Sequence, residues 1–245
     1  AGDSYTVESS ITFYGYTPEM AAGTPEDPEE PGTTPEEPGT TPEEPGTTPE
    51  EPGTTPGTPE EPATELPESS VNSIVNMVQN TAEGGTINVD MGAATVVPKE
   101  VLEAAQGRDV TIELRMDGYT WTINGKDIAA GSLTDINLAV TLNSNAIPSS
   151  TVQKLAGDNP TMQLSLAHNG DFGFRASLTI NVGSEHAGKF GNLYYYDSDG
   201  RMVFMNAGSV NADGSVSLSF SHASDYVVVI SDQEMSQADV PADLQ

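Results

Sequence analysis

Aromatic side chains are the residues of this sequence best suited to contact a ligand. Tyr119 and Trp121 alternate with Thr120 and Thr122, so in a strand the two rings lie on one face. Such rings can stack on the C–H faces of sugars, but they can equally form a cluster in a core. Consecutive tyrosines at 194–196 cannot all point the same way in a strand, and we take Tyr195 as the exposed one. Tyr119, Trp121 and Tyr195 are therefore the candidate ligand-binding residues.

Two acidic turns raise the question of calcium. Asp197-Ser198-Asp199-Gly200 has the opening of a D-x-D-x-D-G calcium loop, but the third oxygen ligand is missing and Asn206 stands where the bidentate Glu belongs. The turn at 211–214 shares these departures. A plain hairpin turn is the favoured interpretation, and calcium binding by Asp197 and Asp199 is the alternative.

Catalytic motifs are absent from the sequence. There is no nucleophile elbow, phosphate-binding loop, dinucleotide fingerprint or HExxH, and there is no cysteine. His168, His186 and His222 form no ligand-spaced pair. Ser221, His222 and Asp225 are too close in sequence to converge readily as a triad. We expect no enzyme activity, no cofactor and no metal.

The charge balance excludes several partners. The net charge is −29, from 37 acidic and 8 basic residues, so a nucleic acid or an anionic membrane surface is not expected to bind. No apolar run reaches the length of a membrane span, and no signal peptide is visible at Ala1. We expect a mature product or an excised fragment that does not insert into a membrane.

A Pro/Thr/Glu-rich linker is expected over residues 17–70. The repeat PEEPGTT begins at Pro35, Pro42 and Pro49, and its prolines disfavour both helix and strand. As a polyproline-like spacer it would reach on the order of 150 Å; a tract for a proline-binding domain is the alternative. Residues 1–16 hold a strand-like run that either ends a preceding module or joins the later sheet. Residues 233–245 are expected to form a second linker.

The folded part is expected over residues 71–232. Apolar residues at 71, 74, 75 and 78 mark one face of a helix, capped by Ser69 or Ser70. The segments from Val89 and from Val140 then repeat one pattern of strand, Val-Pro or Ile-Pro step, short helix, strand and turn, with the turns at Asp117-Gly118 and Asn169-Gly170. The unbroken apolar run 226–230 predicts a buried central strand. The sequence thus predicts a mainly β, sandwich-like domain with two or three short helices and an internal strand-helix-hairpin duplication.

One stretch of the chain resembles a known kind of module. The run 161–230, with GKFGNLYYYDSDG and DGSVSLSFSHASDYVVVI, resembles a non-catalytic C-terminal unit of large exported proteins of gut Firmicutes. VVPKEVLEAAQGRDVTIELRMDGYTWTING looks like the front half of that unit, so the likeness spans about residues 71–232. The resemblance implies a bacterial secreted or cell-surface setting of the cellulosome or amylosome type, and it implies no catalytic residues.

Together these features predict a non-enzymatic extracellular module for adhesion, display or assembly. A carbohydrate-binding module for starch or another plant polysaccharide is the alternative. The expected partners are a polysaccharide or neighbouring modules of the same polypeptide.

Overall fold

The computed structural model describes residues 9–12 and 63–245. Within them the chain forms fourteen regular elements and three short 3-10 turns. In chain order they are β1 (Ser9–Thr12), α1 (Glu68–Asn80), β2 (Gly85–Asp90), β3 (Val96–Val97), α2 (Lys99–Ala105), β4 (Val110–Met116), β5 (Tyr119–Ile128), β6 (Ile136–Asn137), β7 (Val140–Leu142), α3 (Ser149–Ala156), β8 (Thr161–Asn181), β9 (Phe190–Tyr196), β10 (Met202–Ser209) and β11 (Ser215–Ser231), with 3-10 turns at Ser184–His186, Gln237–Asp239 and Ala242–Leu244.

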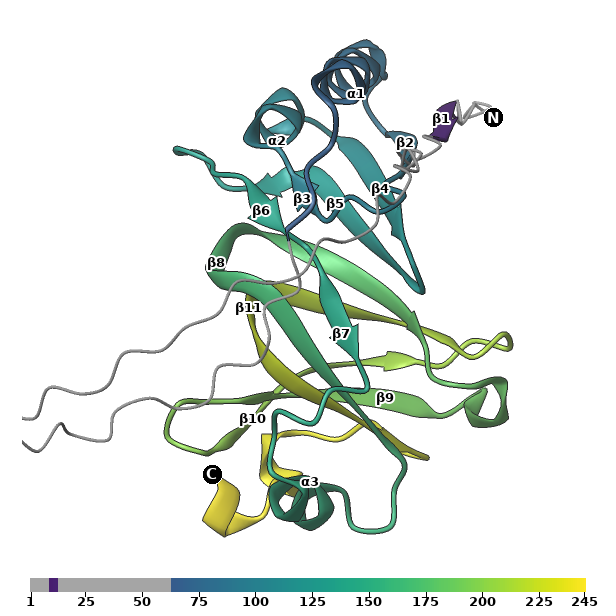
Figure 1. Cartoon of the computed structure of the whole chain (residues 1–245). Helices are drawn as coiled ribbons and strands as arrows, with labels where there is room; N and C mark the ends of the chain where they lie inside the picture. Colours follow the sequence, from purple (N-terminus) through teal and green to yellow (C-terminus); the bar gives the residue numbers. More distant parts are fainter. Residues whose placement is uncertain (1–8, 13–62) are drawn as a thin grey trace, which may run out of the picture. The chain divides into compact units, whose positions relative to one another are not determined.

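Most strands belong to one large curled sheet, which confirms the mainly β class with three helices (Figure 1). Its order is β1-β2-β4-β5-β8-β11-β9-β10, and β7 pairs with β8 beside that path. The strands β3 and β6 form a separate two-stranded sheet. The curl brings the β10 side chain Asn206 to β11, where its amide bonds both the N–H and the C=O of Ser219 at 3.0 and 2.8 Å.

The two long strands β8 and β11 hold this sheet together. They pair antiparallel along most of their length, from Ser215 opposite Asn181 to Val229 opposite Thr161. Two register shifts interrupt this pairing around Phe220–Asp225, and at each of them β8 has three residues more than β11. Such irregularities bend the strands that carry them. One half of β8 also pairs with β5 and the other half with β7, so the same two strands serve both ends of the domain.

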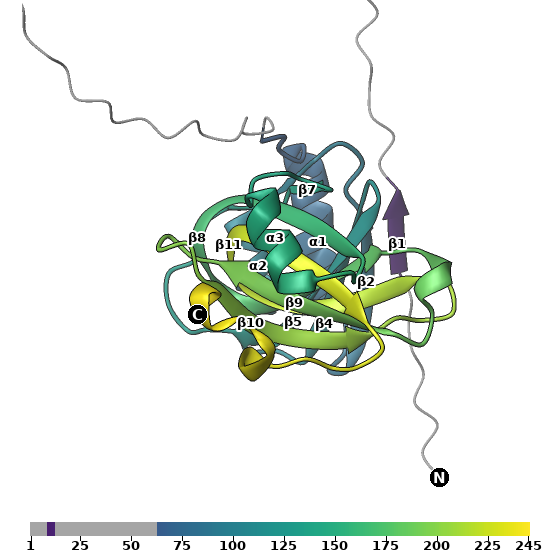
Figure 2. The same ribbon diagram turned by 90° about the horizontal axis from the view of Figure 1, so that it is seen from below.

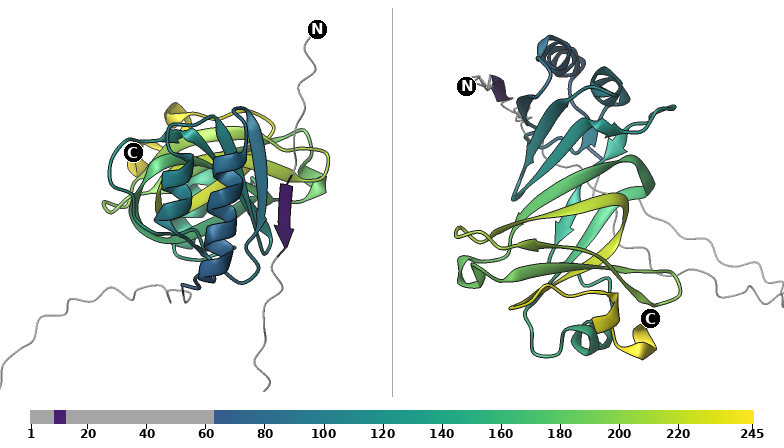
Figure 3. Two further views of the ribbon diagram at one scale, coloured as in Figure 1. Left: turned by 90° about the horizontal axis from the view of Figure 1, so that it is seen from above. Right: turned by 180° about the vertical axis from the view of Figure 1, so that it is seen from behind.

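Helices α1 and α2 lie side by side over the strands β2, β4 and β5 (Figure 1 and the left panel of Figure 3). Their apolar faces, including Ile74, Val78 and Leu102, join the larger core with Ile112 and Trp121. Helix α1 begins at Glu68 after Pro67, so Ser70 lies inside the helix and not at its cap as predicted. Since Leu66 is also buried, the folded part starts earlier than residue 71.

Helix α3 and the C-terminus cover the other end of the sheet (Figures 1 and 2). A second core cluster forms there, with Ile147, Val152 and Leu155 from α3 and its approach, Val227 and Val229 from β11, and Val240 and Leu244 from the C-terminal turns. The prediction of a linker over residues 233–245 is therefore wrong. We call residues 232–245 the C-terminal strap.

The buried side chain of Asn192 in β9 anchors the start of the strap. Its Nδ2 donates to the Ser231 Oγ at 3.1 Å and to the Gln233 carbonyl at 3.3 Å. Its Oδ1 accepts the N–H of Met235 at 2.7 Å. Because Asn192 is fully buried, these bonds replace water for the strap's backbone.

The predicted duplication is visible in the elements but not in their pairing. In the first copy β2 and β4 flank α2 and pair parallel, and the Asp117-Gly118 turn joins β4 to β5 as a hairpin. In the second copy β7 and β8 flank α3 and pair antiparallel. The Asn169-Gly170 step lies inside β8 and makes no hairpin, because the strand continues through it along β11.

Strand β1 joins the sheet at its outer edge, beside β2. The pairing is parallel, with Ser9 opposite Ile87 and Thr12 opposite Asp90. Of the two expectations for residues 1–16, the described part follows the one in which the strand joins the later sheet. The proline-rich repeat lies outside the described residues.

We predict that Asn192→Ala lowers the free energy of unfolding by about 2–4 kcal/mol, because it removes the bonds that a fully buried amide makes to the backbone of the strap. Urea denaturation followed by Trp121 fluorescence measures this. Asn211→Ala is the matched control, since Asn211 bonds Ser215 in an exposed turn and should cost no more than about 0.5 kcal/mol. Equal losses in the two variants would contradict the role of Asn192.

Candidate functional site

Trp121 is a core residue and not a ligand platform. Its ring has 0% of its surface exposed, and its Nε1–H donates to the Leu138 carbonyl at 2.9 Å. The rings of Phe172 and Phe220 meet it edge-on, at centroid distances of 5.9 and 5.6 Å. A sugar cannot stack on a ring that is covered on all sides, so the structure corrects the candidate role of Trp121.

The other two aromatic candidates are half-buried, and the structure does not bring them together with Trp121 on an open face. The Tyr119 hydroxyl accepts the N–H of Val140 at 3.0 Å. The Tyr195 ring packs edge-on against His222 at 4.8 Å and tilts against Tyr226 at 5.8 Å. Across residues 63–245, every aromatic ring is buried or half-buried.

The turn that resembles a calcium loop is organised around Arg201. Asp197 accepts the N–H groups of Asp199 and Arg201 with Oδ1, at 2.9 and 2.8 Å. The Arg201 guanidinium then bonds Asp197 Oδ2 at 2.8 Å and Asp199 Oδ2 at 2.7 Å. The Arg201 guanidinium thus pairs with both candidate carboxylates, and this supports the hairpin-turn interpretation.

Two of the three histidines pack against aromatic rings, and the Nε2 of the third, His186, lies 3.7 Å from the Glu185 carboxylate. His168 packs on Phe172, and burial lowers the pKa of its ring. His222 lies beside Tyr195, while Asp225 accepts a bond from the Ser165 hydroxyl at 2.5 Å. Among the described residues no three His, Cys, Asp or Glu side chains gather into a group that could hold a metal ion.

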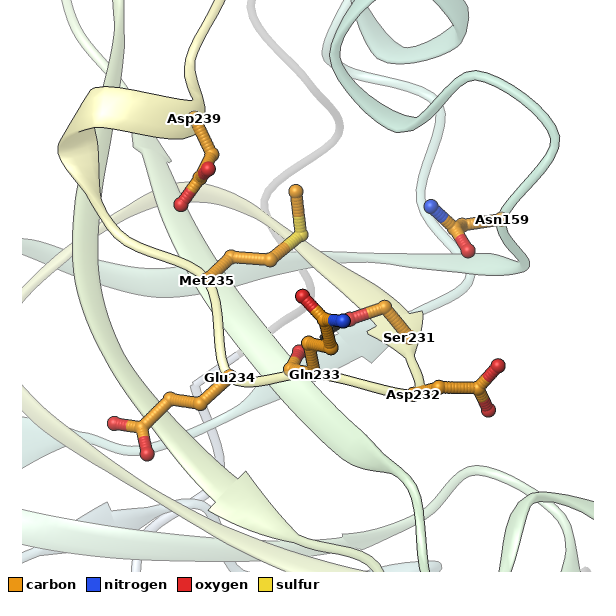
Figure 4. Close-up of a pocket in the computed structure, with 7 residues that line it drawn as sticks. All are labelled: Asn159, Ser231, Asp232, Gln233, Glu234, Met235 and Asp239. Atoms are coloured by element: carbon orange, nitrogen blue, oxygen red, sulfur yellow. Dashed lines mark hydrogen bonds between the residues drawn. The ribbon is translucent and has the colours of Figure 1, made fainter.

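A shallow cavity of about 330 Å³ lies along the strap (Figure 4). Asp232 and Glu234 point out of it in opposite directions, and Asp239 lies on the far side of Met235. The Asp239 carboxylate already accepts the N–H and hydroxyl of Ser236. The acidic side chains that line the cavity therefore do not converge on one point, as metal binding or glycoside hydrolysis would require.

Beneath the strap, the buried Tyr194 hydroxyl has no hydrogen-bond partner among the described residues. Burial, with a smaller contribution from the charge of Asp239, raises the pKa of Tyr194 to about 12. The ring belongs to the second core cluster, so the tyrosine is a packing residue.

The two outer edges of the large sheet are covered in different ways. At the β10 edge, the side-chain amide of Gln237 in the strap bonds the backbone of β10, as a neighbouring strand would. Its Oε1 accepts the Phe204 N–H at 2.6 Å, and its Nε2 donates to the Met202 carbonyl at 3.2 Å. This contact satisfies edge groups that could otherwise pair with another chain.

At the opposite edge, no side chain of residues 63–245 covers the outer backbone of β2 in this way. All of its residues, Gly85–Asp90, pair with β4 on one side, and β1 pairs on the other. The strand GTINVD contains neither lysine nor proline, which are common devices against unwanted pairing. The outer edge of β2 is therefore the candidate functional site that the geometry defines.

The sequence does not predict the contact of Gln237 with β10, and it offers the pairing of residues 1–16 with the later sheet only as one of two alternatives. A glutamine in an acidic, polar tail carries no pattern that predicts contact with a strand 33 residues away. For β1 a signal existed, since the apolar character of residues 5–14 predicts a strand, but the identity of its neighbour depends on the sheet.

No protein-family model matches this chain, and no curated protein shows significant similarity to it. In the part of the chain that the structure describes, no helix is both long and apolar enough to span a membrane.

We predict that millimolar Ca²⁺ leaves the melting temperature unchanged, because Arg201 already pairs with both carboxylates of the turn. Differential scanning calorimetry with and without the ion tests this. A Ca²⁺-dependent rise that Asp197→Asn abolishes would restore the calcium-loop interpretation.

Acid should weaken the same turn. The Arg201 backbone N–H, supported by its guanidinium, holds the pKa of Asp197 below its ordinary value. A carboxyl whose pKa is lowered by folding stabilises the protein above its unfolded pKa, and that stability is lost as the pH falls through the folded pKa. We therefore expect a shallower loss of stability between about pH 4 and pH 2 in Asp197→Asn than in the wild type, measured by urea denaturation. Superimposable pH profiles would refute this.

Proposed function

We propose that this chain is a non-enzymatic extracellular module that serves display or assembly within a multimodular bacterial surface protein. The observation that carries the proposal is the pairing of β1 with the edge of β2. A strand from one end of the sequence is held by a domain that begins more than fifty residues later. Capturing an extended segment by its backbone is a general way for a domain to hold a partner.

The construction of the rest of the domain supports a mechanical role over a chemical one. The continuous β8–β11 pairing joins both helix-covered ends, and the strap is anchored through Asn192. Polar groups that could serve catalysis are engaged in internal bonds, as in the Asp197–Arg201 and Ser165–Asp225 pairs. The acidic composition and the resemblance to modules of exported gut Firmicutes proteins support the extracellular setting.

The alternative function is that of a carbohydrate-binding module, and an experiment can distinguish it from display or assembly. We predict that affinity electrophoresis in gels containing starch, xylan or other soluble plant glycans shows no retardation, since no aromatic ring of residues 63–245 is fully exposed. Reducing-sugar release from the same glycans should stay at background.

Tyr195→Ala is the informative variant, because Tyr195 is a half-buried candidate on β9. Retardation on one glycan that this variant abolishes would replace display and assembly by carbohydrate binding. A glycan-binding protein of known affinity, run in the same gel, is the positive control.

A further inference from the structure

We propose that the outer edge of β2 is a strand-acceptor site that can take β1 from a second copy of this chain. The inference rests on the proposed assembly function and names its partner. Both observations behind it concern described residues: the parallel β1–β2 pairing, and the contrast between the two edges of the sheet.

The site is built from backbone groups. Since β2 pairs along its whole length with β4, its remaining N–H and C=O groups face outward in the register that β1 occupies. The central β2 residues Ile87, Asn88 and Val89 are buried, and β2 is anchored by the helices above it. The acceptor edge is therefore a rigid surface, whereas the donor contributes only the four residues Ser9–Thr12.

The length of the connection between β1 and the domain favours a second copy of the chain as the source of the strand. Fifty residues separate Thr12 from the start of the domain at residue 63. An extended segment of about 15 residues would already span about 50 Å, more than the roughly 40 Å diameter of a domain of this size. The connection of β1 to its own domain is longer than the span requires. A longer connection lowers the effective concentration of β1 at β2 of the same chain, which is of millimolar order.

Pairing within one chain and between two chains makes the same backbone contacts, so only the cost of closing the connection separates them. The connection 13–62 holds thirteen acidic and no basic residues, which repel one another and add to that cost. We conclude that β1 pairs within its own chain in dilute solution. Exchange between copies becomes competitive at about millimolar local concentration, as on a crowded surface.

The test uses the full chain with Ser10→Pro and Ile11→Pro together. Successive N–H groups of a strand point to opposite sides, so two adjacent prolines remove a donor to β2 whichever residue supplies it. The probe is a fluorescein-labelled peptide with the sequence of residues 4–16, SYTVESSITFYGY. We expect fluorescence anisotropy to show binding to the proline variant, and binding to the wild type at least about 10-fold weaker, because its own β1 competes.

Two controls sharpen the result. The peptide carrying the same two prolines should not bind, and a chain with Thr54→Pro and Thr55→Pro, which alter only the repeat, should behave as the wild type. Emission from buried Trp121 verifies that each variant is folded. Absence of binding to the folded proline variant, equal binding to variant and wild type, or equal binding of the proline peptide would overturn the proposal.

A second measurement needs no peptide. Sedimentation equilibrium of the wild type at about 1 mM protein in about 0.15 M NaCl, where the Debye length is about 8 Å and repulsion within the acidic connection persists, should show dimers that the Ser10→Pro, Ile11→Pro variant lacks. Wild type that stays monomeric, or dimers in both chains, would count against strand exchange. Neither variant alters the aromatic candidates for glycan binding, so the electrophoresis result decides the proposed function independently of this one.

Discussion

The long antiparallel pairing of β8 with β11 is the constraint on which the rest of the structure depends. One half of the pair packs under α1 and α2 with β5, and the other half packs over α3 with β7 and β9. The register shifts between the halves bend the strands. Apolar side chains on the two faces of the sheet build two clusters. Strand β11 serves both: Tyr226 and Val228 face the larger cluster, and Val227 and Val229 face the smaller.

Aromatic rings fill the bend itself. Trp121, Phe172, Phe220 and Tyr226 meet edge-on or tilted at centroid distances of 4.9 to 5.9 Å. Edge-to-face pairs of this kind stabilise a core beyond the area they bury. Trp121, which the sequence offers as part of a binding platform, is thus a core residue of this bend.

The two outer edges of the large sheet, at β10 and at β2, have their unpaired backbone groups covered in different ways. An edge strand presents unpaired backbone groups, and those groups will pair with whatever reaches them. At β10 the chain covers them with Gln237 from a strap that is itself anchored by Asn192. At β2 it covers them with a strand carried on a long acidic connection. The first cover is built into the domain, whereas the second can be exchanged without breaking the fold.

Local pattern alone determined much of this protein. The mainly β class, the helix around Ile74 and Val78, the Asp117-Gly118 hairpin and the buried strand 226–230 each follow from periodicity or turn chemistry within a few residues. Partner choice was decided only in the tertiary structure. Burial of Trp121, continuation of β8 through Asn169-Gly170, folding of the strap and capture of β1 all depend on contacts between distant segments. The sequence of a strand predicts that its backbone groups need hydrogen-bond partners. Which segment supplies those partners is decided only when the sheet assembles.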